Sequence, residues 1–390
     1  MTPYDYVIVG AGMAGDAAIG GIRRRDANGS ILMIGDEAYP PYQRPPLSKK
    51  LWIDMRLEDI FLRSAERHRA DLVLTASVEA LDRENRLVHL RDGRIYEYGR
   101  LLLATGARAR SLPGTSAKTF YVGTLGEHIR LRRALSESQD VVVVGGGFIG
   151  AEMASVLAQQ DHRVTWLVYE EYPFAGFFPR LLADHVRDEY TRHGVAIVNH
   201  AEVQQISDQG GRVRVAVADG TWYDADAAIV GVGVAANDAL ARRAGLITQN
   251  GIRVDAELQT ADPHIWAAGD AAVLETESAP MMHEDHALSQ GRLAGENMAG
   301  AHKTYQHQSF YYSDLFHFGY EAVGSCRTTW DVVEDWVDPG NEGVVYYLES
   351  GRVRGVLNWN VWDGIGAARA LIESRESFSA DDLRGRIRNT

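Results

Sequence analysis

The chain has 390 residues, 45% of them hydrophobic and 24% charged, with a formal net charge of −13. This length is too great for a single hydrophobic core, so two or three domains are expected. The acidic balance opposes nonspecific binding to nucleic acid or anionic membranes. No apolar run approaches the roughly 18 residues that would span a bilayer. We therefore expect a globular protein with neither nucleic acid nor a membrane as partner.

Two further features bear on the cellular compartment. The first predicted strand begins near Tyr4, which leaves no room for a targeting signal before it. The one cysteine, Cys326, cannot form an internal disulfide, as expected in a reducing compartment. Both features predict a cytoplasmic protein.

An apolar strand pattern, a glycine-rich turn and a helical pattern follow one another twice. In the first copy a strand at 6–9 leads into a turn at 10–15 and a helix to about residue 25. In the second a strand at 141–144 leads into a turn at 145–150 and a helix to about residue 160. Further apolar strands follow each copy, at 31–34 and 164–168. This βαβ order predicts parallel sheets in an α/β protein.

The rest of the chain is richer in hairpin signals. The turns Asp92–Gly93 and Asp219–Gly220 each stand between short strand patterns. After about residue 305, hairpin strands at 344–348 and 353–358 precede a helical stretch at about 364–374. We interpret this last part as a separate α+β domain.

Both glycine turns have the spacing G-x-G-x-x-G. The first glycine permits a tight turn, the second lets a pyrophosphate approach the backbone, and the third lets the helix pack closely on the strand. The helix N-terminus then offers N–H groups and a partial positive charge to the phosphates. The glycines are Gly10, Gly12 and Gly15 in the first turn, and Gly145, Gly147 and Gly150 in the second.

An acid stands about 20 residues beyond the start of each turn, at the end of the next strand. These acids are Asp36 and Glu170, in the position expected to bond the adenosine ribose hydroxyls. One such match is weak, but the same strand, turn, helix and acid occurring twice predict two dinucleotide sites.

The motif order resembles that of the FAD-dependent pyridine-nucleotide oxidoreductases, in which the FAD site comes first and the NAD(P) site is inserted in the middle. Three more segments carry the resemblance: L-L-L-A-T-G-A at 101–107, I-V-G-V-G-V at 229–234 and I-W-A-A-G-D-A-A at 265–272. It implies that Asp270 meets the ribityl chain of FAD. The other cofactor-binding residues in these segments are Thr105, Gly106, Gly233 and Gly269.

The resemblance implies two Rossmann-like dinucleotide-binding domains, as in glutathione reductase, and a C-terminal α+β domain. The predicted FAD-binding domain is discontinuous and comprises 1–112 and 236–304. The NAD-binding domain covers 113–235 and the C-terminal domain 305–390.

The branch of this family follows from the cysteine content and one segment. Disulfide reductases of the family need a cysteine pair soon after the first βαβ unit, and this chain has none there, so dithiol chemistry is excluded. In its place Y-Q-R-P-P-L-S-K-K-L-W at 42–52 resembles the ferredoxin reductases that serve oxygenases and the apoptosis-inducing factors. This implies that Arg44 lies along FAD and that Lys49, paired with Glu152, lies near flavin N5. Spacing alone favours a solvated Lys49, whereas the R-P-P-L-S-K match favours the site.

The segments at 283–300 and 311–324 closely resemble apoptosis-inducing factor. By that match His286 lies close to the isoalloxazine. Tyr312 stands where that relative has tryptophan, which puts the stability of a charge-transfer complex in doubt. Trp359 or Trp362 faces the ring, or both belong to the domain core; both alternatives are open.

The coenzyme prediction rests on charge. A carboxylate at Glu170 accepts hydrogen bonds from a 2′-hydroxyl and repels a 2′-phosphate, and Glu171 adds to the repulsion. Arg163 stands at the far end of the strand, where it cannot help NADPH. NADH is therefore expected over NADPH.

The resulting hypothesis is a reductase without a redox-active disulfide that passes electrons from NADH through FAD to an iron–sulfur carrier such as ferredoxin or rubredoxin. Lys49 and Glu152 are its predicted catalytic residues, and no metal site is predicted. An acidic ferredoxin would dock on a basic area, although each candidate cluster is also consistent with a solvated helix face. The alternatives are a redox-responsive interaction protein, whose reduced form changes its dimer state, and a quinone or oxygen reductase. The candidate docking clusters are Arg23–Arg24–Arg25 and Arg130, Arg132 and Arg133.

Overall fold

The computed structural model describes residues 2–114, 116–137 and 139–388, which form two compact units. Unit 1 comprises Met1–Pro45, Arg56–Arg108 and Val234–His307, and unit 2 comprises Pro46–Met55, Ala109–Gly233 and Gln308–Thr390. Each unit contains one glycine turn. The segment Pro46–Met55, which the prediction placed in the FAD-binding domain, groups with unit 2. The division into three domains stays a prediction.

Unit 1 is built on a sheet with the order β3-β2-β1-β6-β5-β4, and β18 pairs with β6. The pairs β1–β2, β1–β6, β2–β3 and β6–β18 are parallel, whereas β4–β5 and β5–β6 are antiparallel. All four residues of β2 are buried, as expected for a parallel strand covered on both faces. The strands are β1 Thr2–Val9, β2 Ile31–Ile34, β3 Asp71–Val73, β4 Val78–Asp82, β5 Leu87–Leu90, β6 Ile95–Leu103 and β18 Ile265–Ala267.

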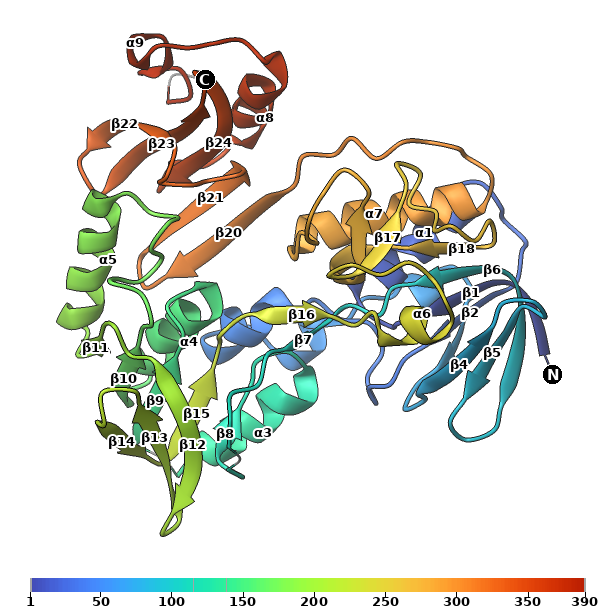
Figure 1. The fold of residues 1–390 in the computed structure, drawn as a ribbon, viewed down its shortest axis with the longest axis horizontal. Helices are drawn as coiled ribbons and strands as arrows, with labels where there is room; N and C mark the ends of the chain where they lie inside the picture. The colour runs from blue at the N-terminus through green and yellow to red at the C-terminus, as the bar shows by residue number, and fades with distance from the viewer. Residues whose placement is uncertain (1, 115, 138, 389–390) are drawn as a thin grey trace. The chain divides into compact units, whose positions relative to one another are not determined.

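Two helices of unit 1, α1 (Met13–Arg23) and α7 (Glu284–Met298), lie side by side (Figure 1). Their backbones approach so closely that a Cβ at Gly291 would lie 2.1 Å from the carbonyl oxygen of Ala14. The first glycine turn is therefore held at the end of a tightly packed helix pair. The smaller elements are α2 Ser64–Arg67, α6 Ala239–Arg243, η3 Leu57–Ile60, η4 Gly269–Ala271, β17 Ile252–Val254 and β19 Ala272–Leu274.

Unit 2 contains a second parallel sheet, with the order β11-β10-β9-β15-β8, and a separate antiparallel meander of β12, β13 and β14. The second glycine turn links β9 to α4, as the sequence predicts. The strands are β8 Thr119–Phe120, β9 Asp140–Val144, β10 Arg163–Leu167, β11 Ala196–Val198, β12 Val203–Gln209, β13 Arg212–Val217, β14 Trp222–Ala225 and β15 Ala227–Val230. The helices are α3 Leu125–Leu135, α4 Phe148–Ala158 and α5 Arg180–Arg192, while β7 Ala107–Ala109 and β16 Val234–Ala236 lie where the chain passes from one unit to the other.

The C-terminal part of unit 2 is an antiparallel sheet with the order β20-β21-β24-β23-β22 (Figure 1). Its strands are β20 Phe310–Leu315, β21 Phe318–Gly324, β22 Asp331–Asp338, β23 Glu342–Glu349 and β24 Arg352–Trp359. Helix α8 (Ile365–Ser374) packs against β21 and β24, and the short α9 (Ala380–Leu383) packs against β22. The predicted fold class, two Rossmann-like parts and a C-terminal α+β part, is confirmed.

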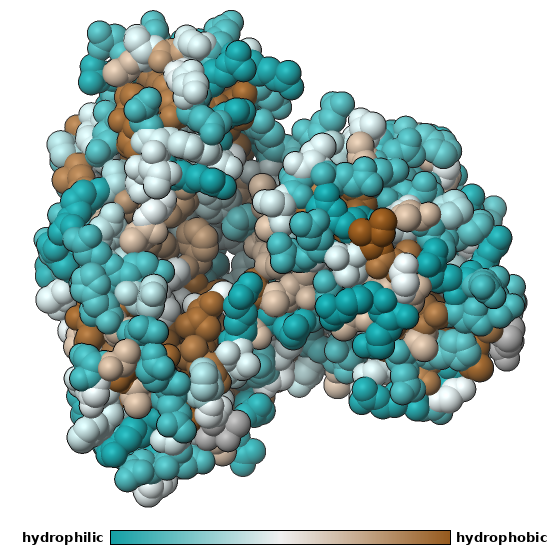
Figure 2. All heavy atoms as spheres, viewed as in Figure 1, coloured by the Kyte–Doolittle hydropathy of each residue, from teal (hydrophilic) through white to brown (hydrophobic). Residues whose placement is uncertain are grey.

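The surface is rich in polar and charged side chains, as expected from a chain with 24% charged residues. Figure 2 shows hydrophilic residues over most of the visible face of each unit. Within the described ranges, no helix combines the length and the apolar character needed to cross a bilayer. Within the same ranges, no group of three or more His, Cys, Asp or Glu residues gathers as metal ligands would.

Candidate dinucleotide sites and a buried lysine–glutamate pair

Each glycine position of the first turn requires glycine for a different structural reason. Gly10 has a φ of +117°, and a Cβ there would lie 2.0 Å from the carbonyl oxygen of Ala104. A Cβ at Gly15 would lie 2.2 Å from the carbonyl oxygen of Gly10. Gly12 differs, because a Cβ there would meet no atom within 4 Å. Open space beside the uncapped N–H groups of a helix N-terminus suits a pyrophosphate.

The second turn repeats this geometry in unit 2. Gly145 has a φ of +114°, and a Cβ there would lie 2.3 Å from the carbonyl oxygen of Gly231. A Cβ at Gly150 would lie 1.9 Å from the carbonyl oxygen of Gly145, whereas one at Gly147 would meet nothing within 4 Å. Both turns therefore fit a dinucleotide.

The two predicted ribose acids differ in their surroundings. Glu170 is exposed just beyond β10, and its Oε2 lies 3.0 Å from the place of a Cβ at Gly146. Its carboxylate therefore lies over the second glycine turn. Asp36 is exposed just beyond β2, and in the described part of the chain its side chain forms no hydrogen bond or ion pair. Glu37, the next residue, is partly buried.

The charged neighbours of Glu170 are already paired. Glu171 lies 3.1 Å from Arg180, and Arg163 lies 2.7 Å from Asp140 at the opposite end of β10. No described arginine or lysine pairs with Glu170, so its negative charge is uncompensated by the protein. This surrounding opposes a 2′-phosphate.

Arg44 belongs to a small polar group in unit 1. Its Nη2 lies 2.8 Å from Glu37 Oε1, and its guanidinium lies 5.2 Å from the centroid of the Tyr42 ring. The Tyr42 hydroxyl donates to Glu37 Oε2 at 2.7 Å. Burial raises the pKa of Asp270 to about 6, and the charge of Arg44 opposes this rise. The sequence reasoning missed Glu37 and Tyr42, although both stand within a few residues of predicted site residues.

Thr105 and Gly106 lie where β6 ends. The Thr105 hydroxyl donates to the carbonyl oxygen of Asn237 at 2.7 Å, and the Asn237 amide donates back to the Thr105 carbonyl oxygen at 2.9 Å. Gly106 has a φ of +64° and Gly233, in unit 2, one of +97°. Through these two hydrogen bonds Thr105 holds the chain at Asn237 next to the end of β6. This role is independent of any contact between Thr105 and a cofactor.

His286 lies in the first turn of α7 and is 2% exposed. Its Nδ1 lies 3.0 Å from the Tyr305 hydroxyl, which also lies 3.0 Å from Ser289 Oγ. Burial lowers the pKa of His286 to about 4, with a smaller contribution from the charge of His283. The imidazole is therefore neutral at neutral pH. Nearby in the same unit, Gly269 has a φ of +72° and its N–H donates to Gln290 at 3.0 Å.

Unit 2 holds Lys49 and Glu152 together as an ion pair. Lys49 Nζ lies 2.8 Å from Glu152 Oε1, with 11% and 2% of the two side chains exposed. The Ser313 hydroxyl donates to the same oxygen at 2.7 Å, and the Ser48 hydroxyl donates to Oε2. Lys50, the next residue, is exposed. The alternative of a solvated Lys49 is thus wrong.

The segment that carries Lys49 is held by helix α3. The Trp52 indole N–H donates to the Leu47 carbonyl oxygen at 2.7 Å, and His128 Nδ1 lies 3.0 Å from the same oxygen. Arg132 Nη1 donates to the Leu51 carbonyl oxygen at 2.6 Å, and its guanidinium lies 5.5 Å from the Trp52 ring centroid. These contacts, which the sequence reasoning did not foresee, fix the backbone on both sides of Lys49.

The aromatic residues singled out in the sequence lie in different surroundings. Lys49 Nζ lies 5.3 Å from the ring centroid of Tyr312. Trp359 is fully buried, stacks on Tyr320 with ring centroids 6.1 Å apart, and donates its indole N–H to Gly340. The prediction that Trp359 faces a cofactor ring is therefore corrected, because its side chain is fully buried against other residues of the core. Trp362 is 51% exposed.

Cys326 is unsuited to redox chemistry. The thiol is buried and free, and burial raises its pKa to about 12. A thiol held protonated in this way is a poor nucleophile.

Comparisons with known proteins agree with this geometry. Residues 4–291 match the family model of pyridine nucleotide-disulphide oxidoreductases, and residues 294–339 match the C-terminal model of mitochondrion-associated apoptosis-inducing factor. The chain is 32% identical to rhodocoxin reductase of Rhodococcus erythropolis over 379 residues, covering 94% of this chain and 88% of that protein.

Two further relatives extend the comparison. The chain is 29% identical to a mitochondrial apoptosis-inducing factor 1 of Drosophila melanogaster, covering 97% of this chain but only 64% of that longer protein. The reductase chain in the covalent putidaredoxin reductase–putidaredoxin complex is similar with a TM-score of 0.90 and 28% identity, covering 98% of this chain and 95% of that one. The chain therefore belongs to the pyridine nucleotide-disulphide oxidoreductase family, a family of oxidoreductases that use FAD and NAD(H).

Proposed function

We propose that this protein is an NADH-dependent reductase that passes electrons through FAD to a small iron–sulfur protein. The observation that carries the proposal is the pairing of two intact dinucleotide turns with a single, buried thiol whose pKa is about 12. A family member without a usable thiol has no disulfide relay, so the flavin must serve an external acceptor directly. The names of the relatives, rhodocoxin reductase and putidaredoxin reductase, support such an acceptor.

The first glycine turn is assigned to FAD and the second to NADH, in the order that the family resemblance implies. In unit 1 the pyrophosphate of FAD would occupy the open space at Gly12, and in unit 2 that of NADH the open space at Gly147. Residues proposed to contact FAD in unit 1 are Gly10, Gly12, Gly15, Asp36, Arg44, Thr105, Gly106, Gly269, Asp270 and His286. Those proposed for NADH in unit 2 are Gly145, Gly147, Gly150, Glu170 and Gly233.

Bound FAD would supply the redox chemistry, because a flavin can take up a hydride and release electrons singly. The chain supplies placement and charge. Lys49 is proposed to present a fixed positive charge to the flavin, and Glu152 holds the ammonium in place at 2.8 Å. The hydroxyls of Ser48 and Ser313 donate further hydrogen bonds to the carboxylate, which fixes its position and orients its ammonium partner.

The exposed arginines of α3 are the proposed docking area for an acidic partner. Arg130, Arg132 and Arg133 are exposed, although Arg132 also anchors the Leu51 carbonyl. In the other candidate cluster, Arg23 donates to backbone carbonyls and Arg24 pairs with Glu296. The α3 cluster is therefore the better candidate, and the rate of electron transfer to the partner should fall with added salt.

A second candidate function is a redox-responsive interaction protein, which the match at residues 294–339 favours. Here the NADH-reduced form would persist and would change a dimer or partner surface. This second candidate function includes the formation of a homodimer.

Anaerobic stopped-flow reduction by NADH tests the two candidates. Flavin reduction within about a second, followed by turnover with a ferredoxin or rubredoxin, supports the reductase. Slow reduction to a long-lived charge-transfer state, with a mass shift toward dimer, would overturn it in favour of the redox-responsive protein.

A further inference from the structure

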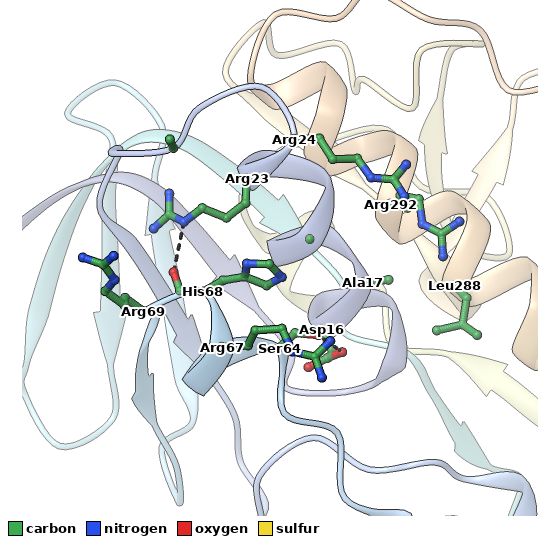
Figure 3. Close-up of a pocket in the computed structure, with 12 residues that line it drawn as sticks. Asp16, Ala17, Arg23, Arg24, Ser64, Arg67, His68, Arg69, Leu288 and Arg292 are labelled. Carbon is green, nitrogen blue, oxygen red and sulfur yellow. Dashed lines mark hydrogen bonds between the residues drawn. The ribbon is translucent and has the colours of Figure 1, made fainter.

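Unit 1 contains a pocket of about 560 Å³ that none of the proposed cofactor contacts lines. It lies among α1, the α2 segment and α7 (Figure 3). The glycine turn stands at the N-terminus of α1, whereas the pocket extends along the same helix from Asp16 to Arg24. Small residues, among them Ala17 and Gly20, leave the hollow open. Its remaining lining is dominated by five arginines, Arg23, Arg24, Arg67, Arg69 and Arg292, beside His68.

Three of these arginines have no carboxylate partner. In the described part of the chain, the side chains of Arg67, Arg69 and Arg292 form no ion pair and no hydrogen bond, and all three residues are exposed. Arg23 donates only to backbone carbonyl oxygens, at 2.8 to 3.2 Å. Arg24 lies 3.0 Å from Glu296, but Lys303 shares that carboxylate at 2.7 Å. The protein therefore leaves most of this positive charge uncompensated.

The one acid in the lining does not cancel it. Asp16 is 5% exposed, and Ser64 donates to its Oδ2 at 2.6 Å. Burial raises the pKa of Asp16, and hydrogen bonds from Ser64 and the charges of His68 and Arg67 oppose the rise. Even with Asp16 ionised, the lining contains five arginines and one carboxylate. In a chain with a net charge of −13, this is a local reversal of sign that concentrates small anions.

The shape of the arginine cluster favours a small ligand over a macromolecule. Figure 3 shows Arg23 and Arg69 on one side of the hollow, Arg24 and Arg292 on the other, and Arg67 beside Ser64 and Asp16. Arginines that line a concavity from several sides suit a compact anion, whereas a flat basic stripe suits an extended acidic surface. The planar guanidinium matches phosphate oxygens in pairs. The volume lies within the range of small-molecule sites.

We propose that this pocket binds a polyphosphate group, carried either by a nucleoside triphosphate or by inorganic polyphosphate. The ligand would bridge α1, the α2 segment and α7 through Arg67, Arg69 and Arg292, and would stabilise unit 1 by binding only the folded state. The site is separate from both glycine turns and does not depend on the proposed reductase function.

Binding is measured by isothermal titration calorimetry on the FAD-loaded protein with saturating NAD⁺, so that both glycine turns are occupied. The probes are inorganic tripolyphosphate, ATP and inorganic phosphate. We expect saturable binding of tripolyphosphate that weakens with added salt, and at least about tenfold weaker binding of inorganic phosphate. Similar affinities for tripolyphosphate and ATP would assign recognition to the phosphates alone, whereas tighter ATP binding would show that the nucleoside is also read.

The double variant Arg67→Ala/Arg292→Ala should bind tripolyphosphate at least about tenfold more weakly. Its matched control is Arg91→Ala/Arg100→Ala, which removes two exposed arginines of unit 1 that do not line the pocket. Flavin content and flavin reduction by NADH should be unchanged in both, which shows that they are folded. If the pocket variant loses flavin, Arg69→Ala replaces it with an expected severalfold loss of affinity. Absence of saturable binding at about 10 mM tripolyphosphate, or equal affinities of pocket and control variants, would overturn the proposal.

Discussion

Lys49 Nζ lies 2.8 Å from Glu152 Oε1, and both side chains are buried. The two residues come from separate segments that only the fold of unit 2 brings together. Removing one member of such a pair leaves the other charge buried without compensation. The pair is therefore both a structural element and the proposed source of a fixed charge for the flavin.

Lys49→Met should lower the free energy of unfolding by about 3 kcal/mol, because Glu152 would keep its burial and lose its cation. We also expect slower flavin reduction by NADH. Chemical denaturation and anaerobic stopped-flow measure the two effects. Lys50→Met is the matched control, since Lys50 is the exposed neighbour, and it should leave both quantities within about 0.5 kcal/mol and twofold of the parent. Equal behaviour of the two variants would contradict the role of Lys49.

Two alanine substitutions in the second glycine turn should fail in different ways. Gly147→Ala adds a methyl group to open space, so the protein should fold, retain its flavin and show a KM for NADH raised about tenfold or more. Gly150→Ala would place a Cβ 1.9 Å from the Gly145 carbonyl oxygen, and should destabilise unit 2 itself. Thermal unfolding and steady-state kinetics separate the cases. A normal KM in Gly147→Ala would refute the assignment of this turn to NADH.

Coenzyme choice should depend on Glu170. Glu170→Gln removes the charge that lies over the second glycine turn without changing the shape of the side chain much. The ratio of kcat/KM for NADPH to that for NADH should rise about tenfold or more, since a 2′-phosphate would no longer be repelled. Glu202→Gln is a control at an exposed acid elsewhere in unit 2, where the ratio should not change. Comparable kcat/KM values for the two coenzymes in the parent protein would already contradict the prediction.

His286 should make the protein sensitive to acid. Its folded pKa of about 4 lies below the usual 6.5, so the unfolded chain binds the proton first as the pH falls. The stabilisation present above about pH 6.5 is therefore lost toward pH 4, by roughly 3 kcal/mol at most.

His286→Gln removes this titration, so its free energy of unfolding should approach that of the parent as the pH falls from 7 to 4. Denaturant titrations across that range provide the measurement. A difference from the parent that stays constant between pH 7 and pH 4 would show that His286 does not titrate as described.

The sequence by itself determined the repeated strand, glycine turn and helix, and the hairpin and helix of the C-terminal sheet. These features depend on local periodicity and on positions such as Gly10 and Gly145, where a positive φ excludes other residues. The predicted hairpin at 344–348 and 353–358 lies within β23 and β24, and the predicted helix at 364–374 nearly coincides with α8.

Only the tertiary structure decided how side chains from distant segments meet. It placed Trp359 in the core rather than at a ring, joined Arg44 to Glu37, and gathered Arg67 and Arg292 around one pocket. Local propensity carries no information about such contacts, because burial and charge compensation depend on which distant segments pack together. The chemistry of the chain could be read from its motifs, but the surroundings that set the charge of each group arise from long-range packing.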